Sequence, residues 1–115
     1  MMKRVSLLRR LPHLSHAQFA AHWSGPHIAI VRQLPGVRGL RLNPVRTWSP
    51  EDAGWDGIGE LWFDTIEAAQ AAFATEPFAS QLKADRALFA LEVQSCFVTE
   101  MTIISPPDGR EPWPE

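Results

Sequence analysis

Residues 21–37, AHWSGPHIAIVRQLPGV, carry the middle and the end of the helical pattern from which the rest of the chain can be organised. Apolar residues recur around this stretch at helical spacing, at Phe19, Trp23, Ile30 and Leu34. Ser24-Gly25-Pro26 interrupts them, and glycine and proline are both unfavourable inside a helix. His22 and His27 stand on either side of the interruption. The sequence therefore predicts a helix that is broken at residues 24–26, with an imidazole at each side of the break.

Signals for both ends of this helix lie in the neighbouring sequence. Ser15 and Gln18 form an S-x-x-Q capping box, which is typical of a helix start. Pro35-Gly36 ends the helix directly after Leu34. Residues 3–10 precede it as a predicted strand, and residues 37–48 follow it as a second strand that Gly39 and Pro44 weaken.

The second half of the chain repeats the pattern of strand, helix and strand. Residues 56–63, DGIGELWF, alternate as a strand in which Ile58, Glu60 and Trp62 share one face. Asp64 is the predicted cap of a second helix, whose apolar stripe is Ile66, Ala69 and Phe73. Pro77 is suited to open a further helical segment, and residues 92–104 form a predicted fourth strand.

The predicted order is strand, helix, strand, strand, helix, strand. This order is typical of the α+β ferredoxin-like fold, a split βαβ arrangement in which a four-stranded antiparallel sheet carries both helices on one face. We expect one domain over residues 1–104, followed by a proline-rich arm over residues 105–115. Because the last strand carries apolar residues on both faces, the face without helices needs a cover, and a homodimer is expected.

Composition and charge exclude several classes of function. The 115 residues are 45% hydrophobic and carry a net charge of −2, so no basic surface for nucleic acid is indicated. No apolar run approaches the roughly 18 residues that a membrane span needs. The single cysteine, Cys96, is predicted to lie in the core and suits a reducing compartment. We therefore expect a cytoplasmic protein that binds neither nucleic acid nor membrane.

Two longer stretches resemble the EthD family of the dimeric α+β barrel superfamily. They are LLRRLPHLSHAQFAAHWSGPHIAIVRQLPGVRGL and DGIGELWFDTIEAAQAAF, within roughly residues 3–102. The family pattern places a serine, a phenylalanine, an HW pair, a second histidine, an LPG helix stop and a DG-x-x-E-x-W-F strand. The matching residues here are Ser15, Phe19, His22, Trp23, His27, Leu34-Pro35-Gly36, Asp56-Gly57, Glu60, Trp62 and Phe63. The break SGP departs from many relatives, which have longer or charged residues there.

The resemblance implies a small enzyme that works without a cofactor. EthD-like relatives include lyases, dehydratases and isomerases of polyketide or aromatic-degradation pathways. The favoured expectation is proton transfer on a small cyclic or aromatic organic substrate. Two alternatives remain open: a non-catalytic ligand-binding or accessory subunit of an oxidative degradation system, and a haem-binding protein, since related dimeric α+β barrels use a histidine as axial ligand.

His22 and His27 are the candidate general bases or acids. A spacing of five residues does not place two metal ligands on one face of an α-helix, so a metal site is disfavoured. An imidazole titrates near neutral pH and can move protons. The alternative is a structural role, in which the histidines bind backbone carbonyl groups that Pro26 leaves without a partner. Of the two, His22 ranks slightly ahead, because Phe19 and Trp23 place it at the edge of the buried helix face.

Glu60 is the candidate partner acid, and several aromatic residues are candidate walls of a pocket. A carboxylate on an apolar strand face has a raised pKa or a fixed partner, and an ion pair with Arg9, Arg38 or Arg41 is the slightly favoured explanation of Glu60. Trp23, Ile58 and Trp62 are the candidate substrate-binding residues, with Trp48 and Trp55 as further aromatic candidates. Ordinary core packing is the competing explanation for all of them.

Overall fold

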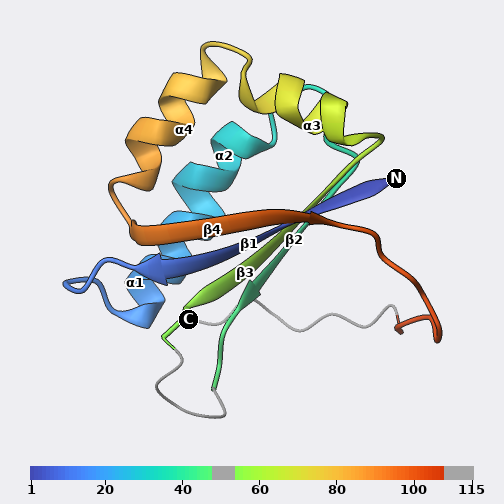
Figure 1. The fold of residues 1–115 in the computed structure, drawn as a ribbon. Helices are drawn as coiled ribbons and strands as arrows, with labels where there is room; N and C mark the ends of the chain where they lie inside the picture. The colour runs from blue at the N-terminus through green and yellow to red at the C-terminus, as the bar shows by residue number, and fades with distance from the viewer. Residues whose placement is uncertain (48–53, 108–115) are drawn as a thin grey trace.

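A four-stranded sheet with helices packed on one face makes up the fold, in a computed structural model that describes residues 1–47 and 54–107 (Figure 1). The strands of this described part are β1 (Met2–Arg10), β2 (Gly39–Pro44), β3 (Gly57–Phe63) and β4 (Ala90–Val98). Its helices are α1 (His16–His22), α2 (Ile28–Val31), α3 (Ile66–Phe73) and α4 (Phe78–Arg86), with a π-helical turn, η1 (Trp23–His27), between α1 and α2. None of these helices is long and apolar enough to cross a membrane.

The sheet has the order β2-β3-β1-β4, and each neighbouring pair of strands is antiparallel. The central strands β1 and β3 pair along most of their length, with Leu8 opposite Gly57. β4 lies on the outer side of β1, where Lys3 is opposite Val98. This topology confirms the predicted order of elements and the ferredoxin-like α+β fold with its helices on one face.

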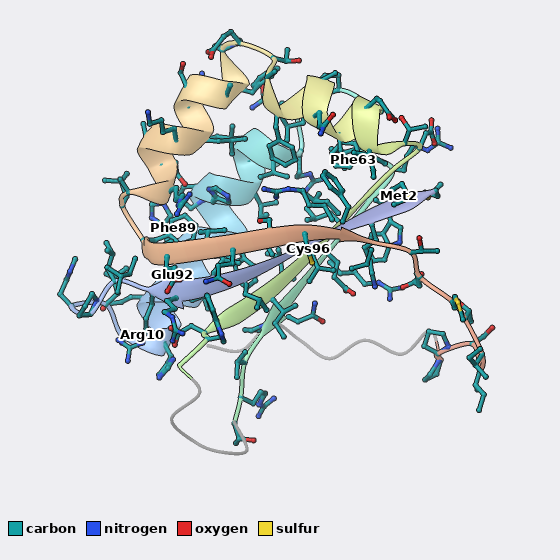
Figure 2. The ribbon with its side chains drawn as sticks, viewed as in Figure 1. Met2, Arg10, Phe63, Phe89, Glu92 and Cys96 are labelled. Atoms are coloured by element: carbon teal, nitrogen blue, oxygen red, sulfur yellow. The ribbon has the colours of Figure 1, made fainter. Side chains whose placement is uncertain are left out.

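Alternation along the central strands separates a helix-covered face from a face without helices. Leu8, Leu61 and Phe63 point toward the helices and are buried, and Phe63 has no exposed surface. Phe63 is seen between the sheet and the helices in Figure 2. Val5 and Leu7 alternate with Leu8 on β1 and lie half-buried on the other face. We call this second surface the open face of the sheet.

The buried core between sheet and helices consists of two clusters. The first, here the α3 cluster, contains Val31, Leu34, Leu61, Phe63, Ala69, Ala72 and Leu82. The second, here the α1 cluster, contains Leu8, Phe19, Trp23, Phe89 and Ala90. Burial of a large apolar side chain contributes about 1.5 to 3 kcal/mol, so the fully buried Phe19, Phe63 and Phe89 are major contributors to stability.

The first helix is not broken at residues 24–26, and in this respect the sequence-based prediction was wrong. The chain continues through them as the π-helical turn η1. In a regular α-helix Pro26 would collide with the carbonyl group four residues earlier, and the wider turn avoids that collision. The hydroxyl of Ser24 donates to the carbonyl oxygen of Ala20 at 2.8 Å. The start of the helix is as predicted, with Ser15 as cap and Gln18 completing the capping box.

Several other boundaries differ from the prediction, and the helix ends at Val31 rather than at Leu34. Thr65, and not Asp64, caps α3, because its hydroxyl accepts the backbone N–H of Ala68 at 3.0 Å. β4 ends at Val98 and does not continue to residue 104, since β1 extends only one residue beyond Lys3, the partner of Val98. β2 is shorter than the predicted strand over residues 37–48.

The ends of the chain and the single cysteine complete the comparison with the sequence. Residues 105–107 form neither helix nor strand, and residues 108–115 of the predicted arm lie outside the described residues, as does Trp48. Cys96 was predicted in the core, but it is exposed. Cys96 lies on β4 opposite Val5 of β1, so its side chain points to the open face.

Candidate functional site

A single carboxylate, that of Asp85 on α4, joins the two histidines on either side of η1. His22 donates from Nε2 to Oδ1 of Asp85, and His27 donates from Nδ1 to Oδ2, each over 2.9 Å. Asp85 is 9% exposed, and a buried carboxylate is stable only when its oxygens are hydrogen-bonded. The structure therefore brings the two predicted histidines together around a residue that the sequence reasoning did not single out.

The π-helical turn explains why a spacing of five residues places both imidazoles on one side. In an α-helix, residues three and four apart are neighbours on one face. The π-helix closes its hydrogen bonds between residues five apart, so His22 and His27 come one above the other across η1. The argument from α-helical spacing was wrong at this point, because the local structure is not an α-helix.

Phe89 packs against both imidazoles. Its ring centroid lies 4.9 Å from that of His22, in a stacked arrangement, and 4.8 Å from that of His27. The side chain of His27 is 15% exposed, and that of His22 is 23% exposed. Burial lowers the pKa of His27 below its ordinary value, while the hydrogen bond and the charge of Asp85 pull the pKa upward. The neutral imidazole, which accepts protons, is thereby favoured near neutral pH.

A cavity of about 240 Å³ lies beside His27, between the sheet and the helices. Its walls come from both core clusters and include Leu8, Trp23, Val31, Leu61, Leu82 and Phe89. His27 borders the cavity, whereas His22 and Asp85 do not. Since Asp85 holds Nδ1 of His27, Nε2 is the ring nitrogen that is left for a molecule in the cavity. An engineered cavity of about 150 Å³ accepts benzene, so this one has room for a substituted single ring.

Trp23 is a cavity wall whose position depends on two glycines of β3. A Cβ atom on Gly57 would lie 2.5 Å from the indole ring, and one on Gly59 would lie 3.3 Å from it. The absence of side chains there leaves space for the indole against the strand, where Trp23 is 2% exposed. Among the predicted substrate-binding residues, Trp23 is therefore the one that the structure places at the cavity.

The structure does not bring Glu60, Ile58 and Trp62 together with the histidines. These three residues alternate with the glycines that face Trp23, so their side chains lie on the open face. Glu60 borders the cavity from β3, and its carboxylate binds Nζ of Lys3 at 2.9 Å. Lys3 is the ion-pair partner, in place of the three arginines that the sequence suggested, and it also lies over the ring of Trp62.

Comparison with models of protein families identifies the family of this chain. Residues 11–91, which include both histidines and Asp85, match the family model of the EthD domain, over more than half of the chain. The chain belongs to the EthD family. The resemblance seen in the sequence is thereby confirmed. A search of the curated proteins found none that matches this EthD-family sequence.

Many solved structures have the same fold, among them three from bacteria. An ethyl tert-butyl ether d (EthD) family protein from Bacillus halodurans has a TM-score of 0.71 at 22% identity, covering 88% of this chain and 100% of that one. SnoaB, a cofactor-independent oxygenase from Streptomyces nogalater, has a TM-score of 0.66 at 17% identity, covering 91% and 97%. A dimeric ferredoxin-like protein of unknown function from Bacteroides fragilis has a TM-score of 0.64 at 11% identity, covering 84% and 93%. At these identities the likeness shows the fold alone.

Asp85 is the site residue of this EthD-family chain that sequence reasoning missed. It lies on α4 three residues after Leu82 and four residues before Phe89, both of which are buried. A carboxylate in line with two buried apolar residues is unusual, because a buried charge needs a partner. That position was the available signal.

The side chains of His22, His27 and Asp85 form hydrogen bonds with one another. Each oxygen of Asp85 accepts a hydrogen bond from one imidazole nitrogen. Across residues 1–47 and 54–107, no group of three His, Cys, Asp or Glu side chains is arranged to hold a metal ion. What the arrangement can do is hold His27, a residue of the cavity wall, in one tautomer through its Nδ1.

Proposed function

We propose that this EthD-family protein is an enzyme that moves a proton on a small cyclic or aromatic organic substrate, without a cofactor, and that His27 is its base. One observation carries the proposal: His27 borders the cavity while its Nδ1 is bound to the buried carboxylate of Asp85. A histidine oriented by a carboxylate is a recurring acid–base arrangement in enzymes. The size of the cavity supports a substrate with a single substituted ring.

The proposed reaction uses only this pair of side chains. Nε2 of His27 takes a proton from an acidic C–H group of the substrate, which leaves the electron pair on the substrate. The resulting imidazolium is stabilised by the Asp85 carboxylate, which accepts the hydrogen bond from Nδ1. Return of the proton to a different substrate carbon gives an isomerisation. Transfer of the proton to a leaving hydroxyl group expels water and gives a dehydration.

His22 acts in this proposal as a positioning residue. Its Nε2 binds the other oxygen of Asp85 and so fixes the orientation of the carboxylate. The sequence ranked His22 slightly ahead of His27 as the base. We reverse that order, because His22 is not among the residues that border the cavity. Glu60, Ile58 and Trp62 have no part in the proposed reaction, since their side chains are on the open face.

We also propose that two copies of the chain associate through their open faces in the cytoplasm. The half-buried apolar residues of that face support a homodimer, and the Bacteroides fragilis protein with this fold is described as dimeric. The one cysteine of the chain is free and exposed, which suits a reducing compartment. A small hydrophobic organic molecule is the proposed ligand of the cavity.

Hydrogen–deuterium exchange at carbon tests the proposed function directly. A panel of cyclic ketones, lactones and aromatic polyketide fragments is incubated with the protein in D₂O, and loss of C–H signals is followed by NMR together with product formation. His27→Gln is expected to lower the exchange rate by about 10² to 10⁴-fold. His13→Gln, at an exposed loop position, is the matched control and should retain the rate. Full activity of His27→Gln on a turned-over substrate would contradict the proposal.

The same panel separates the alternative functions. A non-catalytic binding protein would shift ligand signals without exchange or product. Oxygen uptake, measured with an electrode, would indicate instead a reaction of the kind named for the Streptomyces nogalater protein. A shifted Soret band after haem addition, lost in His27→Gln, would favour haem binding.

A further inference from the structure

Arg4 is a largely buried cation for which the described part of the chain offers no carboxylate. It lies on β1, on the helix-covered face, and borders the same cavity as His27. Its Nη1 donates to the hydroxyl of Ser6 at 3.1 Å, and its guanidinium lies 4.2 Å from the centroid of the Phe73 ring. Among residues 1–47 and 54–107, no Asp or Glu oxygen lies within ion-pair distance of it.

A cation in this position has unused capacity to bind an anion. A guanidinium carries five N–H donors in a planar fork, and the hydrogen bond to Ser6 uses only one of them. Burial desolvates the guanidinium of Arg4 and lowers its pKa. A buried charge is normally paired, and a carboxylate matches the guanidinium fork with two parallel hydrogen bonds.

Two further cations border the cavity. Lys83 and Arg86 border the cavity from α4, and both are exposed. No ion pair with either of them is formed within the described residues. The one acidic residue at the cavity wall is Glu60, whose carboxylate is bound to Lys3 on the open face. Three cations and no facing carboxylate give the cavity a positive potential.

We infer that the cavity binds a cyclic or aromatic carboxylate, whose carboxylate group pairs with Arg4 and whose ring extends toward His27. The inference rests on the proposed function, in that it takes this cavity as the substrate site. Ser6 supports the guanidinium from β1, and Phe73 holds it from above by a cation–π contact. Lys83 and Arg86 attract the anion from solvent at the α4 side of the cavity.

Arg4 and His27 border the cavity from different elements, β1 and η1. Arg4 and Leu8 are four residues apart on the strand, a separation of about 13 Å. Leu8 belongs to the α1 cluster together with Phe89, against which His27 packs. In this proposal the carboxylate of the ligand lies at Arg4, and its ring lies against the α1 cluster beside His27. The carboxylate of the substrate positions the ring by binding Arg4, and the reacting C–H group lies on the opposite side of the ring.

Paired probes that differ only in charge test the inference. Benzoate is compared with benzamide, and 2-naphthoate with 2-naphthamide, by titration into the labelled protein with NMR shifts of backbone amides as the signal. We expect at least one acid to bind the wild-type protein tenfold or more tightly than its amide. Arg4→Gln should abolish that preference while amide binding is unchanged, and Arg4→Lys should keep part of it. Arg32→Gln, which removes an exposed arginine away from the cavity, is the matched control.

The outcomes separate this inference from the proposed function. Equal binding of both acids and their amides to the wild-type protein overturns the inference, and so does an acid preference that survives in Arg4→Gln. Melting curves establish that the variants are folded. If Arg4→Gln is unfolded, Arg4→Lys is used in its place, and an acid preference equal to that of the wild type then overturns the inference. His27→Gln should keep the acid preference, because it does not touch Arg4. If the wild-type protein prefers the acids but exchanges no C–H proton of the ketones, lactones and polyketide fragments, the proposed proton transfer is refuted and the anion site remains.

Discussion

His27 and Asp85 are 58 positions apart in the sequence, and their side chains meet at 2.9 Å. The contact depends on two elements at once. The π-helical turn η1 presents His27 on the same side as His22, and α4 brings the carboxylate to both. Because Asp85 accepts from Nδ1, the neutral form of His27 has its free electron pair on Nε2. The role assigned to His27 therefore depends on the carboxylate remaining an acceptor.

Replacement of Asp85 by asparagine is expected to remove most of the activity. The amide keeps the shape of the carboxylate, but its NH₂ group can only donate, so it can force the wrong tautomer on His27. A comparable change in an aspartate–histidine pair of a hydrolase lowers kcat by about 10⁴-fold. We expect Asp85→Asn to lower kcat much more than it changes KM, in steady-state assays on the turned-over substrate. Asp64→Asn, at an exposed position, is the control. An unchanged kcat in Asp85→Asn would remove the carboxylate from the mechanism.

The pH dependence of stability follows from the burial of His27. Burial lowers the pKa of His27 in the folded state below the ordinary value of 6.5, which the unfolded chain retains. Between the two pKa values the unfolded state binds more protons, so this contribution to stability is present above pH 6.5 and is lost as the pH falls toward the folded pKa. Thermal unfolding between pH 8 and pH 5 should show a smaller decline for His27→Gln than for the wild type. Parallel declines would show that His27 does not carry the effect.

Local features of the fold could be predicted from the sequence, whereas contacts between distant segments could not, because those contacts depend on tertiary packing. The capping box at Ser15 and Gln18 is a local signal, and the local contacts formed as predicted. The shared face of Glu60 and Trp62 followed from strand alternation alone. Which face the helices cover depends on packing across the whole sheet, and here the local pattern was insufficient. The partner of Lys3 and the approach of Asp85 to the histidines are likewise set by tertiary structure.

A methyl group on Gly57 should destabilise the fold through Trp23. The added Cβ would lie 2.5 Å from the indole, far inside contact distance, so the ring or the strand must shift. Overpacking of a core costs about 1 to 3 kcal/mol, and we expect Gly57→Ala to lose that much stability in urea unfolding. Gly25→Ala is the matched control, because a Cβ there meets nothing within 4 Å. Equal stability of the two variants would mean that the indole is not held by the strand.

The open face of the sheet carries the surface by which a second copy is expected to bind. Half-buried apolar side chains of the central and outer strands lie on it, namely Val5, Leu7, Ile58, Trp62 and Val98. Charged residues such as Lys3 and Glu60 are paired with each other among them, which lowers the cost of covering them. Patches of this kind usually mark an interaction surface.

A charge in the middle of that face should separate the two copies. Light scattering of the wild type at micromolar concentration is expected to give twice the mass of one chain, since a specific interface buries above about 1,000 Å². Leu7→Glu places an unpaired carboxylate on the central strand β1 and should give the mass of one chain with the sheet intact by circular dichroism. Leu88→Glu, where the side chain is already 61% exposed beyond the end of α4, should remain dimeric. A monomeric wild type would refute the homodimer.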